Sequence, residues 1–155
     1  MVRSSDCLAK FGEPVKENPW LVLWDVPSDL HVGVIPKRIY CNKLLVDPLQ
    51  AAFINLISRG YAESELLTWD GCFNIRLTTG GASWSLHSWG IAIDVNAFEN
   101  GYAKPPKLTP GFVDCFSDGF DLGELGWKLI YAFVCWPEFL APTPSLSGAI
   151  FRRKL

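Results

Sequence analysis

Apolar side chains recur at helical spacing between residues 47 and 60. Those that share one face are Leu49, Ala52, Phe53, Leu56 and Ile57. Just before them, Asp47 is a suitable N-cap, and Pro48 fits the first helical position, where its missing N–H costs nothing. Gly60 is typical of a residue that ends a helix. The pattern therefore predicts an amphipathic helix that begins after Asp47 and ends at Gly60.

A second helix is indicated further along the chain. The pair Thr109-Pro110 repeats the arrangement of an N-cap followed by proline, and it predicts a helix through about Ser117 that Gly119 ends. The segment before it, from Asn100 to Leu108, is polar and rich in proline, so we expect a loop there.

Five further segments have the composition of short strands. They are Trp20–Trp24, Arg38–Asn42, Cys72–Leu77, Trp89–Phe98 and Leu129–Trp136, and Asp70-Gly71 is typical of a turn. Within the fourth segment apolar residues alternate with others, so that Asp94 faces away from the side of Ile93 and Val95. Short strands and helices without an internal repeat predict an α+β fold, with helices packed on one face of a small antiparallel sheet.

The ends of the chain differ in composition from its middle. Proline and tryptophan are concentrated in the first thirty residues, and proline recurs after residue 141. We therefore expect an extended N-terminal arm over residues 1–34, a folded domain over residues 35–140, and an irregular tail over residues 141–155.

Composition narrows the class of protein. The chain has 155 residues, 49% of them hydrophobic and 19% charged, which is typical of a compact soluble domain. Its net charge of -2 does not favour nucleic-acid binding. No apolar run is long enough for a membrane span, and the N-terminus lacks the apolar core of a signal peptide. The five cysteines contain no Cys-x-x-Cys pair, which argues against a zinc ribbon or a disulfide framework.

The segment from Ser85 to Asp94 carries the clearest chemistry. It has the pattern Ser-x-His-x-x-Gly-x-Ala-x-Asp, and its His87 is one of only two histidines in the chain. A turn around Gly90 would let His87 and Asp94 point at one spot, where imidazole and carboxylate together suit a divalent metal, zinc above all. The alternative is a structural histidine hydrogen-bonded to a nearby carboxylate.

This pattern resembles the signature of the zinc D-alanyl-D-alanine carboxypeptidases and L-alanyl-D-glutamate endopeptidases, most of all their phage-borne branch. The resemblance covers roughly residues 35 to 127. It implies a peptidase of bacterial cell-wall peptide with zinc as cofactor and His87 and Asp94 as metal ligands. It also implies a catalytic or substrate-binding role for Arg76 and a supporting, substrate-side role for Ser85. Trp89, beside the signature histidine, either lines the substrate groove or fills the core.

The chain departs from this family near its C-terminus. The family's third ligand is a second histidine preceded by an acidic general base, and no histidine follows His87 here. At the matching distance, Glu138 stands near the place of that histidine and Cys135 near the place of the base. Glu138 is therefore the candidate for a catalytic or ligating carboxylate. The base is left open among Asp118, Asp121 and Glu124, and divergence or a shifted frame would explain the changed tail.

Two hypotheses about function follow. In the first, the chain is a zinc peptidase that binds peptidoglycan peptide, of phage or prophage origin, and neither nucleic acid nor membrane is its partner. In the second, it is a non-catalytic relative of the same fold that binds phage structural proteins in a virion. Without a signal peptide, we expect it in the host cytoplasm with phage-mediated export, or in the virion.

Overall fold

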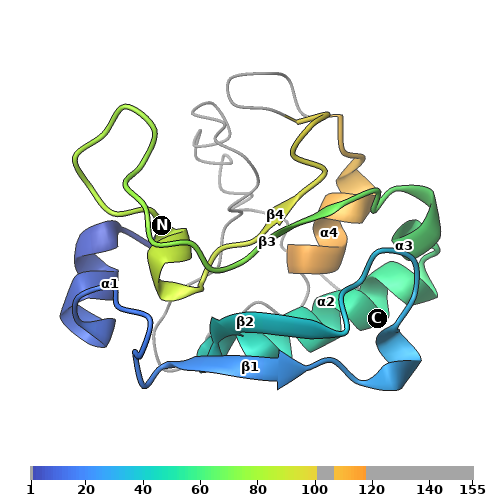
Figure 1. Cartoon of the computed structure of the whole chain (residues 1–155). Coiled ribbons are helices and arrows are strands. Elements are labelled where there is room, and N and C mark those ends of the chain that lie inside the picture. The colour runs from blue at the N-terminus through green and yellow to red at the C-terminus, as the bar shows by residue number, and fades with distance from the viewer. Residues whose placement is uncertain (1, 101–106, 118–155) are drawn as a thin grey trace, which may run out of the picture.

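A computed structural model describes residues 2–100 and 107–117 of the chain. Its helices are α1 (Ser4–Phe11), α2 (Val46–Ser58), α3 (Tyr61–Ser64) and α4 (Pro110–Ser117), and its strands are β1 (Leu21–Asp25), β2 (Arg38–Asn42), β3 (Trp69–Gly71) and β4 (Asp94–Val95) (Figure 1). Short 3-10 helices span Ser28–Leu30, Lys43–Leu45 and Leu86–Trp89. The α+β class predicted from the sequence is confirmed.

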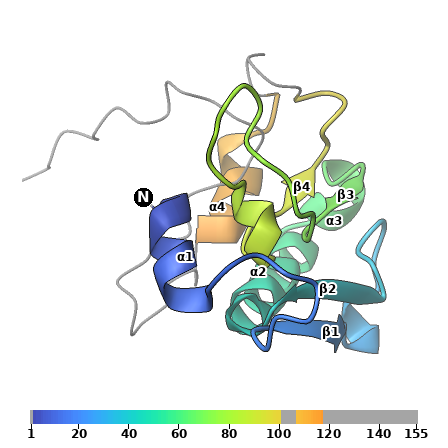
Figure 2. The same ribbon diagram turned by 60° about the vertical axis from the view of Figure 1, so that its left-hand side comes forward.

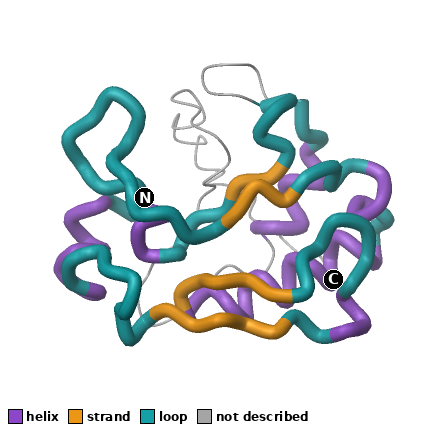
Figure 3. Tube along the Cα trace, viewed as in Figure 1, coloured by secondary structure: helices purple, strands orange, loops and turns teal. Residues whose placement is uncertain are grey.

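The strands form two antiparallel sheets of two strands each, rather than one sheet. In the first, β1 pairs with β2 in a register that places Leu21 opposite Asn42 and Asp25 opposite Arg38. In the second, the short strands β3 and β4 place Gly71 opposite Asp94, with an irregular register. The two sheets lie one above the other in the view of Figure 3.

Helix α2 links the two sheets through its buried face. The ring of Phe53 stacks on Trp24 of β1, with centroids 6.1 Å apart and planes inclined by 6°. The same ring meets Trp69 of β3 edge-on, with centroids 5.7 Å apart. Phe53 is fully buried, and so are Leu49 and Leu56 on the same face. The face predicted from the sequence therefore forms the centre of the main core.

The two predicted helices form, with one change of boundary. Helix α4 begins at Pro110, and Thr109 Oγ1 accepts a hydrogen bond from the Phe112 N–H at 3.3 Å, as an N-cap should. Helix α2 begins at Val46, before Asp47, because a 3-10 helix leads into it. That lead-in is capped by Asn42, whose Oδ1 accepts from the Leu44 N–H.

The N-terminal segment is not the extended arm that the sequence suggested. Cys7 and Phe11 lie on one face of helix α1, and this face packs in a smaller core with Trp89 and Ile91. The helix therefore lies beside the 3-10 helix that carries residues 86–89 (Figure 2). Local proline and tryptophan content did not reveal this distant packing. The predicted tail over residues 141–155 lies outside the described residues.

Two of the predicted strands are largely replaced by other structure. Asp70-Gly71 belongs to β3 and is not a turn. Within residues 72–77, only Leu77 forms a β-bridge, to Trp84. The strand predicted over 89–98 is reduced to Asp94–Val95, and left-handed backbones interrupt it on both sides, at Gly90 with φ 62° and at Asn96 with φ 50°. The predicted strand Leu129–Trp136 lies outside the described residues.

No helix within residues 2–100 and 107–117 has both the length and the apolar character of a membrane span.

Candidate functional site

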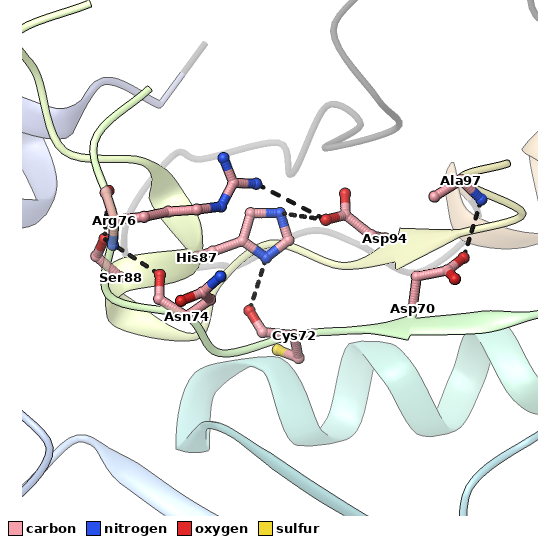
Figure 4. Close-up of polar contacts among 8 residues, drawn as sticks. All are labelled: Asp70, Cys72, Asn74, Arg76, His87, Ser88, Asp94 and Ala97. Carbon is pink, nitrogen blue, oxygen red and sulfur yellow. Dashed lines mark hydrogen bonds and ion pairs between the residues drawn. The ribbon is translucent and has the colours of Figure 1, made fainter. Parts of the chain in front are cut away.

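The structure brings together three side chains that the sequence singled out. His87 Nε2 lies 3.2 Å from Asp94 Oδ2, and Arg76 Nη2 lies 3.8 Å from the same oxygen (Figure 4). The His87 side chain is 8% exposed, whereas those of Asp94 and Arg76 are 27% and 40% exposed. A ligand in solution therefore has access to the carboxylate and the guanidinium, whereas the imidazole is nearly buried.

A backbone carbonyl fixes the orientation of the imidazole. His87 Nδ1 lies 2.8 Å from the carbonyl oxygen of Cys72. Because a carbonyl can only accept, Nδ1 carries the hydrogen and donates it. Nε2 is therefore the nitrogen that faces Asp94. A metal-binding histidine commonly has this arrangement, with one ring nitrogen bonded to a carbonyl and the other directed at the metal.

The facing atoms require a positive charge near them. With Nδ1 protonated, a neutral imidazole presents a lone pair on Nε2, and the Asp94 oxygen presents another at 3.2 Å. Either a proton on Nε2 or a metal ion between the two atoms would remove this repulsion. Arg76 places its own positive charge near the same Asp94 oxygen, but the ion pair is 3.8 Å long and both side chains reach solvent, so it contributes little stability.

The glycine of the signature holds the site against the first sheet. The Gly90 carbonyl accepts from the Asn42 N–H at 2.9 Å and from the Cys72 thiol at 3.3 Å. A Cβ on Gly90 would come within 2.8 Å of the Asn42 nitrogen. The signature therefore needs glycine here for two reasons, a left-handed backbone and close contact with β2.

The asparagine after the signature anchors the other end of β4. Asn96 is buried, with φ 50°, and its Oδ1 accepts from the backbone N–H groups of Leu67 and Thr68 at 2.8 and 3.0 Å. Its Nδ2 donates to the Glu65 carbonyl at 2.7 Å. These bonds fix the strand two residues after Asp94, so they hold that carboxylate in place.

Two other residues that the sequence placed at the site, Ser85 and Trp89, are buried. Ser85 is 7% exposed, and its backbone N–H donates to the Arg76 carbonyl at 2.9 Å; the role predicted for its side chain stays a prediction. Trp89 is 1% exposed and lies in the smaller core, where its indole N–H donates to the Gly12 carbonyl. The substrate-binding role predicted for Trp89 is therefore wrong in this structure, because helix α1 covers the ring.

Sequence reasoning missed two contributors to the site. One is the Cys72 carbonyl, which orients His87 and which no side-chain pattern reveals. Burial raises the pKa of the Cys72 thiol well above its usual range, and Cys41 and Asp94 add to this effect, so the thiol stays protonated as a donor to Gly90. The other is Ser88, a buried serine next to the signature histidine that bonds to the backbone of Arg76.

No third candidate ligand joins His87 and Asp94 within the part of the chain that the structure describes. Residues 2–100 and 107–117 contain no group of three or more histidine, cysteine, aspartate or glutamate side chains that would hold a metal. His31, the other histidine, lies 2.9 Å from the Val26 carbonyl through its Nε2. Glu138 and Cys135, named from the sequence, lie outside the described residues.

The chain was also compared with known proteins. Neither protein-family models nor curated proteins nor solved structures gave a match.

Proposed function

We propose that this protein is a zinc-dependent peptidase that acts on the peptides of bacterial peptidoglycan, with His87 and Asp94 as two of its metal ligands. The observation that carries the proposal is the oriented imidazole. Its Nδ1 is bonded to a carbonyl, and its Nε2 faces a carboxylate oxygen 3.2 Å away. The likeness of the Ser85–Asp94 segment to a peptidase signature supports the same conclusion.

The separation of the two donor atoms suits zinc. His87 Nε2 and Asp94 Oδ2 lie 3.2 Å apart, close enough for both atoms to bind one zinc ion, and imidazole and carboxylate are both ligands that zinc accepts. When bound, the metal would lower the pKa of a coordinated water and polarise a peptide carbonyl. A catalytic site also needs a third protein ligand, and Glu138 is our proposal for it.

Arg76 would recognise the substrate. Its guanidinium is 40% exposed beside the proposed metal ligands, and the planar fork of arginine binds a carboxylate through two parallel hydrogen bonds. Cell-wall peptides carry free carboxylates. Arg76 would therefore hold such a group close to the zinc, with the scissile bond at the metal.

A second function, zinc-dependent binding without hydrolysis, is favoured by the absence of any histidine after His87 in the sequence. With Glu138 in its place, the ligand set would contain one imidazole and two carboxylates, which is less selective for zinc. A phage structural protein that keeps the fold and the metal would fit this description.

Metal analysis of the purified protein tests both functions at once. Wild-type protein should retain a single equivalent of zinc, and so should His31→Ala, which removes the other histidine. His87→Ala and Asp94→Asn should lose the metal while keeping a native circular-dichroism spectrum. Equal zinc content in all four proteins would refute the proposed site.

Activity is then measured on purified cell wall with the zinc-loaded protein. Release of new amino termini by wild type, but not by Arg76→Gln, supports the peptidase. Bound zinc without any release supports the second function.

A further inference from the structure

We infer that Ser88 is a positioning residue, which sets the Arg76 guanidinium beside the His87–Asp94 pair. Its hydroxyl contacts the Arg76 backbone on both sides. Oγ accepts from the Arg76 N–H at 3.1 Å and donates to the Arg76 carbonyl at 3.0 Å (Figure 4). The Asn74 carbonyl, 3.4 Å away, is a weaker alternative acceptor. The inference concerns the substrate side of the site, so it rests on the proposed function.

The hydroxyl replaces a strand partner. Residues 73–76 belong to no sheet, although the sequence predicted a strand there. Their neighbours are residues 85–88, which form a 3-10 helix and so cannot offer a regular ladder of backbone groups. Two backbone bonds remain, from the Asn74 N–H to the His87 carbonyl and from the Ser85 N–H to the Arg76 carbonyl. Only the Ser88 hydroxyl bonds to the Arg76 N–H among the contacts of the described residues.

Burial makes this contact hard to replace. Ser88 is 1% exposed, so water has little access to the Arg76 N–H if the hydroxyl is removed. A buried donor without a partner is costly, and the backbone would shift to regain one. Ser88 directly follows His87 in the chain and bonds to the Arg76 backbone, so a shift at this contact would move Arg76 relative to His87.

The ion pair cannot provide this positioning by itself. Arg76 Nη2 and Asp94 Oδ2 are 3.8 Å apart and both side chains reach solvent, and such pairs contribute little. The position of the Arg76 backbone therefore matters, because it sets the point from which the side chain reaches Asp94. Ser88 therefore links the residue that carries the guanidinium to the neighbour of the residue that carries the imidazole, through bonds of its hydroxyl to the Arg76 backbone.

A double-mutant cycle separates positioning from general support of the fold. The probe is N-acetyl-D-alanine, a small monocarboxylate, titrated into zinc-loaded protein by calorimetry. We expect Ser88→Ala to weaken its binding about tenfold in the wild-type background. In the Arg76→Gln background the same change should have less than a twofold effect, and Ser88→Thr, which keeps the hydroxyl, should restore binding. Equal losses in both backgrounds, or no loss in either, would overturn the inference.

A metal-free measurement keeps the inference testable if the proposed function fails. The NMR signal of the Arg76 Nη2 group reports on its pairing with Asp94. In Ser88→Ala we expect this signal to move toward its position in Asp94→Asn, and in Ser88→Thr to stay at the wild-type position. A Ser88→Ala signal that stays at the wild-type position would overturn the role of Ser88. Failure of wild type to bind zinc would refute the proposed function alone.

Discussion

Substitution of Gly90 by alanine should destabilise the protein strongly, for reasons that can be separated. The backbone there has φ 62°, a left-handed conformation that costs an L-residue about 1–2 kcal/mol. The new Cβ would also lie 2.8 Å from the Asn42 nitrogen and 3.1 Å from the Cys41 carbonyl carbon. These are backbone atoms of β2, so they cannot turn away as a flexible side chain would.

To relieve the clash between the new Cβ and the β2 backbone, the chain around residue 90 must move away from β2. The movement would stretch the 2.9 Å hydrogen bond from the Asn42 N–H to the Gly90 carbonyl, which contributes about 1 kcal/mol. With the conformational cost and the strain of overpacking, we expect a loss of about 3–4 kcal/mol in the free energy of unfolding. That is a large share of the stability of a domain of this size.

Gly80→Ala provides the matched control. Gly80 has φ 72°, close to that of Gly90, but a Cβ there meets no atom within 4 Å. The Gly80→Ala protein should therefore lose only the conformational cost, about 1–2 kcal/mol, in its free energy of unfolding. Urea unfolding followed by tryptophan fluorescence measures both variants. Equal destabilisation of the two would show that contact with β2 does not constrain Gly90, and would refute the reasoning.

Three further predictions concern buried groups. Asn96→Ala should cost about 2–4 kcal/mol in urea unfolding, because it leaves buried backbone groups without partners, and a loss under 1 kcal/mol would contradict the anchoring of β4. Trp89→Phe should cost about 1–2 kcal/mol, since it removes the indole bond to the Gly12 carbonyl, and an unchanged stability would argue against that bond. Burial raises the pKa of the thiols of Cys7 and Cys41 to about 12, from 9.0. As the pH rises, the unfolded chain therefore loses these protons before the folded protein does. The contribution of the two thiols to the free energy of unfolding is complete below pH 9 and is lost between pH 9 and about pH 12. The loss is at most about 1.4 kcal/mol per pH unit for each thiol. Unfolding curves of Cys7→Ala and Cys41→Ala should be less steep in pH than wild type over that window, and identical slopes would contradict the shift.

Sequence reasoning succeeded where the signal is local. Helix α4 could be predicted because Thr109 and Pro110 determine its start within a few residues, and β2 was predicted over its observed range. The grouping of Arg76, His87 and Asp94 could be expected from a resemblance alone, that of Ser85–Asp94 to a peptidase signature with an arginine upstream of it.

It failed where distant contacts decide the structure. The strand expected over residues 72–77 is absent because a side chain, Ser88, bonds to its backbone in place of a second strand. For Trp89 the sequence left substrate groove and core as alternatives, and only its contact with helix α1, far away along the chain, places it in the core. The sequence pattern of residues 1–11 does not predict the contact between helix α1 and Trp89, since the two lie far apart along the chain.

The contact between β2 and the signature segment has a consequence for the order of folding. The Asn42 side chain donates to the Trp89 carbonyl at 3.2 Å, across a separation of 47 residues. Closing so long a loop costs entropy that short-range contacts do not, whereas helices such as α2 form from neighbouring residues. We therefore expect the segment that carries His87 and Asp94 to reach its final position late in folding, once it has docked against β2. During synthesis, the two ligands that we propose for zinc would be held in place only once the ribosome has released the chain beyond residue 96.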